Sequence, residues 1–180
     1  MSDRNLPGWR LCILLGIAAA AGLWAQGLAQ ADRALARTWL LTDCGLGGNL
    51  RLEQQLASRG AILEAPFLEA LDKGPPADEI APVERLARDR FDKRQRSLDD
   101  PNRRIEMSAA DREAYRGITR DDFVNTERAS FILRWRTQAI AGLALVGGDK
   151  ARQALRAVAR DRSSPLRENA AAALQRLSRR

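Results

Sequence analysis

The chain has 180 residues, enough for one domain of ordinary size and a short additional segment, and its 30 Lys and Arg against 23 Asp and Glu give a net charge of +7. Histidine is absent, which excludes Ser-His-Asp and Cys-His catalysis as well as His-ligated zinc and haem. Two cysteines are too few for a disulfide framework or a four-cysteine zinc site. We therefore predict no catalytic residue, no metal site and no cofactor.

The first element is an uncharged run over residues 11–31, which follows the basic residues Arg4 and Arg10. This order is typical of an export signal, with Ala29-Gln30-Ala31 as the cleavage site and Gly27-Leu28-Ala29 as a second candidate. Cleavage after Ala31 would leave a periplasmic or secreted protein. The alternative is an uncleaved inner-membrane anchor, because 21 uncharged residues just suffice to cross a bilayer core.

Residues 32–180 are predicted to form one all-α domain, because no stretch alternates apolar and polar residues as a strand would. A first helix over 32–42 ends at the glycines of Cys44-Gly-Leu-Gly-Gly-Asn49. Cys44, the cysteine left in an exported chain, is expected to be buried or to form an intermolecular bond. Asn49 is expected to cap the second helix, which ends at Ser58 before Gly60.

A third helix over 61–71 ends at the break Lys73-Gly-Pro-Pro76, and a fourth follows to about Arg96. Residues 97–122 are predicted to be an irregular charged insertion. Within it, Ser108 with Asp111 and Thr119 with Asp122 indicate two helix starts. The remaining helices are predicted over 120–146, 150–160 and 165–177.

An internal repeat lies near the C-terminus. Residues 136–146 align with residues 167–177 at a constant offset of 31 positions, with Ala139 matching Ala170 and Leu143 matching Leu174. A period of this length built from two helices is typical of a solenoid, in which each helix pair stacks on the next.

The repeat over about 134–177 resembles HEAT-like repeats, particularly the short bacterial kind. The positions that carry the resemblance are Leu155, Val158, Asp161, Pro165, Leu166, Arg167, Ala170, Ala171, Leu174 and Leu177. The resemblance implies an α-α superhelix of antiparallel helix pairs, in which Asp161 and Arg167 form a structural ion pair that bridges repeats. Residues 61–96 share the helix–Gly-Pro-Pro–helix layout without the Ala-Ala-Leu signature.

Too few repeats are present to form a stable stack alone, so the N-terminal helices are expected to cap it. This predicts one continuous core through Trp39, Phe67, Leu86, Trp135, Leu143, Leu155 and Leu174.

The candidate partner-binding surface is a basic face of the fourth helix that continues into the insertion. Its residues are Arg85, Arg88, Lys93, Arg96, Arg103 and Arg104. The alternative interpretation is a solvated face with intrahelical ion pairs to the acidic residues between them. Export favours an acidic protein, an anionic membrane surface or lipopolysaccharide over nucleic acid as the partner.

These features together predict an exported, non-enzymatic helical-repeat protein that acts as a protein-interaction or scaffold module in the cell envelope. One alternative is a basic HEAT-like module that binds nucleic acid in the cytoplasm. Another is a lyase-like enzyme of the HEAT-repeat class that uses Asp121, Asp122 and Glu127. The residue pattern does not indicate an oligomeric state.

Overall fold

The computed structural model describes residues 29–42, 48–100 and 108–179, and secondary structure in these ranges consists of helices without a strand. The predicted all-α class is thus confirmed. The helices span 29–41, α2 (Leu50–Arg59), α3 (Glu64–Lys73), α4 (Ala77–Asp99), α5 (Ala109–Arg116), α6 (Arg120–Val146), α7 (Asp149–Arg160) and α8 (Arg167–Ser178), with a 3₁₀ turn over Gly60–Leu63.

Three helices begin where the capping residues predicted. The side chains of Asn49, Ser108 and Thr119 each accept a hydrogen bond from a backbone N–H three residues further on, at the starts of α2, α5 and α6. The ends of α3 and α6 are also set by single residues, because Gly74 and Gly147 have φ values of 77° and 74°. L-residues with a side chain rarely adopt this conformation, so the helices stop there.

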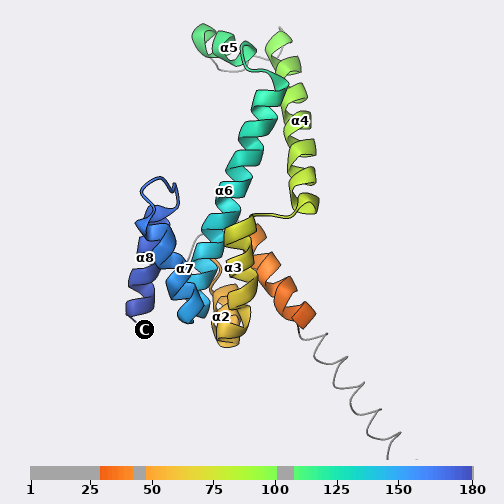
Figure 1. Cartoon of the computed structure of the whole chain (residues 1–180). Coiled ribbons are helices and arrows are strands. Elements are labelled where there is room, and N and C mark those ends of the chain that lie inside the picture. Colours follow the sequence, from red (N-terminus) through yellow and green to blue (C-terminus); the bar gives the residue numbers. More distant parts are fainter. Residues whose placement is uncertain (1–28, 43–47, 101–107, 180) are drawn as a thin grey trace, which may run out of the picture.

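Helix α6 is the longest element and belongs to two parts of the molecule (Figure 1). Its first half packs against α4, and α5 lies at the far end of this pair, which we call the arm. Its second half packs against α2, α3 and α8. Within the described residues this second half is buried over Gln138–Ile140 and Gly142–Val146, and it forms the centre of what we call the body.

The body contains two helix pairs, α3 with α6 and α7 with α8, and α6 also packs on α8. The 31-residue repeat relates the second helix of each pair, and some equivalent positions share their burial. Ala139 and Ala170 are both fully buried, and Val146 and Leu177 are both buried. Ile140 is buried whereas its equivalent Ala171 is exposed.

The pairing of α3 differs from the layout predicted over 61–96. Helix α3 packs on α6, and α4 also packs on α6, further along the arm. The physical cause is the Gly74-Pro75-Pro76 break, which ends α3 and carries the chain past it before α4 begins. The part of the chain that does not belong to a helix pair of the body therefore begins at α4, earlier than the predicted insertion at 97–122. That predicted insertion contains the regular capped helix α5.

The predicted core is confirmed at most of its positions. Trp39, Phe67, Leu143 and Leu155 are fully buried, and the buried cluster also contains Trp135 and has Leu174 packed against it in a partly buried position. The prediction for Leu86 is wrong, because its side chain is 50% exposed. The apolar stripe of α4 passes instead through Ala87 and Phe91, and Phe91 contacts the ring of Phe123 across the arm.

Specific contacts hold the body together. The indole N–H of Trp39 donates to the backbone oxygen of Gln138 over 2.8 Å, which fixes helix 29–41 on α6. The carboxylate of Glu64, at the start of α3, accepts a hydrogen bond from the backbone N–H of Ala151 in the first turn of α7. Because the first N–H groups of a helix lack intrahelical partners, Glu64 caps α7 from the neighbouring pair.

The predicted signal or anchor segment lies mostly outside the described residues, as do Cys44, Arg103 and Arg104. Ala29, Gln30 and Ala31, the predicted cleavage site, belong to helix 29–41. A search of the described ranges finds no helix whose length and apolar character would let it cross a membrane.

Candidate binding surfaces

A groove runs between helix 29–41, α3, the Pro75-Pro76 segment and α6, with a volume of about 580 Å³. We call it the Trp135 groove. It is lined by Arg33, Ala36, Arg37, Leu40, Ala65, Pro66, Glu69, Ala70, Lys73, Gly74, Pro75, Pro76 and Trp135. Two properties of these residues bear on what the groove could bind: a buried polar atom without a partner in the described structure, and four charged side chains in the lining.

Apolar side chains supply the buried part of the lining. Ala36, Leu40, Ala70 and Trp135 are all buried, and Trp135 is only 4% exposed. The indole nitrogen of Trp135 is itself buried, and it has no hydrogen-bond partner among the described residues. A buried N–H without an acceptor is costly and uncommon.

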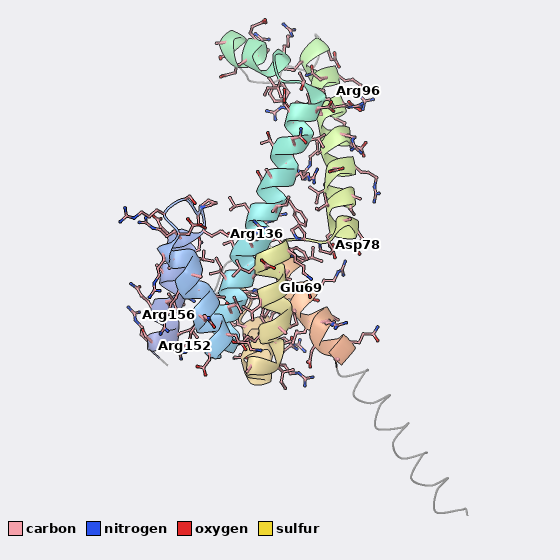
Figure 2. All side chains as sticks on the ribbon, viewed as in Figure 1. Glu69, Asp78, Arg96, Arg136, Arg152 and Arg156 are labelled. Carbon is pink, nitrogen blue, oxygen red and sulfur yellow. The ribbon has the colours of Figure 1, made fainter. Side chains whose placement is uncertain are left out.

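Charged side chains contribute the exposed part of the lining. The Lys73 ammonium group donates to the Glu69 carboxylate over 2.9 Å. This hydrogen bond, together with the charge of Lys73, lowers the pKa of Glu69, and the same contact raises the pKa of Lys73. Figure 2 labels Glu69 on α3, near the helix over 29–41. At neutral pH both groups are charged.

The two arginines of the groove differ in their partners. Arg37 forms an ion pair with Glu79, at the start of α4. Arg33 is exposed and forms no ion pair with any described residue. The groove thus combines an apolar lining, one unpartnered indole N–H and one exposed cation, Arg33, whose charge acts on Glu69 without forming an ion pair with it.

A second groove of about 600 Å³ lies between α3 and the α7–α8 turn. It is lined mainly by apolar side chains, and its cation, Arg136, donates to the backbone oxygen of Asp72 over 3.0 Å. Arg136, labelled in Figure 2, holds the end of α3 beside α6 through this bond, while its Nε atom is buried without a hydrogen-bond partner in the described structure. We regard this groove as structural.

The predicted basic face lies along α4, where acidic side chains offset it. Arg88 forms an ion pair with Glu84, and Arg96 donates to the backbone oxygen of Asp92. Arg85 and Lys93 are exposed and form no ion pair or side-chain hydrogen bond within the described ranges. Helix α4 as a whole contains six basic and six acidic residues, so the helix has no net excess of positive charge.

Further ion pairs use the charges of α4 to hold the arm together. Asp92 pairs with Arg120, and Arg90 pairs with Glu127 over 3.7 Å. At the far end of the arm, the guanidinium group of Arg94 lies 4.1 Å from the centre of the Tyr115 ring, which fixes α5 on α4. None of these arm contacts uses a residue of the predicted basic face, so that face stays a prediction.

The three carboxylates predicted for the alternative enzyme function do not come together in one site. Asp122 accepts a hydrogen bond from the Thr119 hydroxyl in the cap of α6, Glu127 pairs with Arg90, and Asp121 is exposed in the first helical turn. Among the described residues there is no group of three or more His, Cys, Asp or Glu side chains that could hold a metal ion.

Asp161 and Arg167 also lie differently from the predicted ion pair. The Asp161 carboxylate accepts hydrogen bonds from the hydroxyl (2.6 Å) and the backbone N–H (2.9 Å) of Ser163, and these bonds lower the pKa of Asp161. In the described part of the chain the two residues form no ion pair with each other. The reason is that Asp161 stabilises its own turn, between α7 and α8.

The sequence analysis did not identify the Trp135 groove. Trp135 falls on the apolar stripe of α6 and was assigned to the core, which its burial confirms. Only the packing of helix 29–41 beside α3 brings Arg33 and Lys73 to the same cleft. Comparison with known proteins finds no matching family model, no similar curated protein and no similar solved structure.

Proposed function

We propose that this chain is a non-enzymatic helical-repeat scaffold of the cell envelope, and that it binds a segment of a partner protein in the Trp135 groove. The observation that carries the proposal is the buried Trp135 indole N–H that lacks an acceptor beside an apolar cleft. Backbone carbonyl groups of a bound segment are suitable acceptors for this donor.

The charges of the groove indicate that the bound partner segment is acidic as well as apolar. Lys73 and Arg37 form ion pairs with carboxylates, whereas Arg33 forms none with a described residue and acts on Glu69 only through its charge. A bound segment with apolar side chains and one acidic residue would therefore satisfy both the lining and Arg33. Grooves between helices that bind such segments rely on a few buried anchor residues surrounded by a polar rim.

Site-specific photocrosslinking in the producing cells tests the proposal. A photoreactive amino acid replaces Ala65, which is exposed and lines the groove, or Ala57, which is an exposed alanine on α2 outside it. We expect one discrete adduct from position 65 and none from position 57. The same adduct should weaken when Arg33→Glu is added. Equal adducts from both positions, or no adduct from position 65, would contradict the proposal.

Cell fractionation tests the envelope location separately. Recovery of the protein in the cytosol with its Met1 end intact would overturn export without affecting the groove.

A further inference from the structure

The positive charge of the described chain is concentrated on α7, α8 and the turn between them. Residues 149–179 contain eight Lys and Arg against three Asp and Glu, in contrast to the balanced α4. We call these eight residues the C-terminal basic surface: Lys150, Arg152, Arg156, Arg160, Arg162, Arg167, Arg176 and Arg179.

The cations of this surface are not neutralised within the described structure. Every ion pair among the described residues joins positions between Asp32 and Arg128, and none involves residues 149–179. Asp161, an acidic residue of this region, is engaged by Ser163. Arg152 donates to the backbone oxygen of Leu177 over 3.4 Å, which leaves its charge uncompensated by a carboxylate.

The cations also have a regular spacing. Arg152, Arg156 and Arg160 are four residues apart on α7, so they form one stripe with about 6 Å between successive positions along the axis. Figure 2 labels Arg152 and Arg156 on the α7–α8 side of the body, away from the arm. Arg162 extends the stripe into the turn. The surface therefore presents several cations to one large anionic partner.

The composition of this surface favours one class of polyanion. The large exposed apolar residues of the described chain all lie before position 134, so residues 149–179 lack the apolar centre of a protein interface. They also contain no aromatic residue on which a nucleic-acid base could stack. A layer of anionic headgroups requires neither feature, because it attracts basic side chains by charge alone.

We propose that the C-terminal basic surface binds the headgroups of an anionic phospholipid bilayer. The uncharged run over 11–31, predicted to be an export signal or anchor, would bring the chain to such a bilayer. The surface lies on α7 and α8, whereas the Trp135 groove lies between helix 29–41, α3 and α6, so the two sites can be occupied independently.

Cosedimentation of the full chain with lipid vesicles tests this inference. One set of vesicles is pure phosphatidylcholine and the other contains 30% phosphatidylglycerol, at about 0.1 M salt. The test variant combines Arg156→Gln, Arg160→Gln and Arg162→Gln, because these exposed side chains form no hydrogen bond or ion pair with a described residue. The control variant removes three charges from α4 by Arg85→Gln, Lys93→Gln and Arg96→Gln.

We expect stronger binding to the anionic vesicles, and about 100-fold loss of that preference in the test variant, since each of the three basic residues near such a surface contributes roughly fivefold. The control variant should retain most of the preference. Binding through residues 11–31 would be equal for both vesicle types and for all three proteins. No preference for anionic lipid, or equal losses in both variants, would overturn the inference. So would binding of a duplex DNA probe that is tighter than vesicle binding and is lost in the same test variant.

Discussion

Replacement of Gly142 by Ala probes the contact between α3 and α6 most sharply. A methyl group at this position would lie 2.7 Å from two carbons of the Phe67 ring and 2.9 Å from a third. Nonbonded carbons are most favourably separated by about 3.5–4.0 Å. Phe67 is fully buried, so its ring has little room to move away.

Two opposing effects set the magnitude. In a helix interior, Gly→Ala by itself stabilises by about 1 kcal/mol, whereas forcing an extra methyl group into a packed core costs about 1–3 kcal/mol. Because the methyl would overlap a rigid aromatic ring, we expect the cost to exceed the gain, with net destabilisation of up to about 2 kcal/mol. Urea denaturation of the purified protein measures the free energy of unfolding directly.

Gly142→Ala in a Phe67→Leu protein shows whether the destabilisation comes from this clash or from any change at position 142. Phe67→Leu removes the ring, so Gly142→Ala should become neutral or stabilising when both substitutions are present. The double-mutant cycle then gives a favourable coupling energy of at least about 1 kcal/mol. Stabilisation by Gly142→Ala in the wild-type background would refute the close approach of α3 and α6.

Three further predictions concern single contacts. Glu64→Ala removes the acceptor of the Ala151 N–H and should destabilise by about 1–3 kcal/mol in urea denaturation, whereas Glu64→Gln, which keeps an oxygen acceptor, should cost less. Asn49→Ala removes the cap of α2 and should cost about 1 kcal/mol in thermal or urea unfolding; an unchanged stability would show that the cap contributes nothing. Lys73→Met should raise the pKa of Glu69 toward its usual 4.5, because the hydrogen bond and charge that lower it are lost, and carboxyl NMR titration would show no change if the Lys73 contact is absent.

Local signals in the sequence predicted the helices well. The caps at Asn49, Ser108 and Thr119 and the glycine at 147 act within a few residues of themselves, so their effects can be predicted from sequence alone. The prediction of α6 over 120–146 matches the structure at both ends for this reason.

The pairing of the helices could not be predicted from the same signals. Apolar periodicity shows that a helix has an inward face, but it does not identify the helix that covers that face. Leu86 and Ala87 are adjacent, and only the packing of α4 on α6 determines that Ala87 is buried and Leu86 is exposed. The Trp135 groove depends on three segments from distant parts of the chain, so no single motif marks it.

The charged surfaces show the same limitation. A count of arginines identified α4, but Asp92 and Glu84 offset that charge once the arm is folded. The excess on α7 and α8 is visible in the sequence as a shortage of acidic residues, which is a better indicator than the number of basic residues.

Hydrogen–deuterium exchange along α6 is the most direct test of the central claim, that the second half of this helix is the centre of one shared core. The backbone N–H groups from Ala139 to Val146 should be the slowest to exchange, because α2, α3 and α8 cover this half. The N–H groups from Val124 to Ser130, which belong to the arm, should exchange orders of magnitude faster. Equal protection along the whole helix, or slower exchange in the arm, would contradict it.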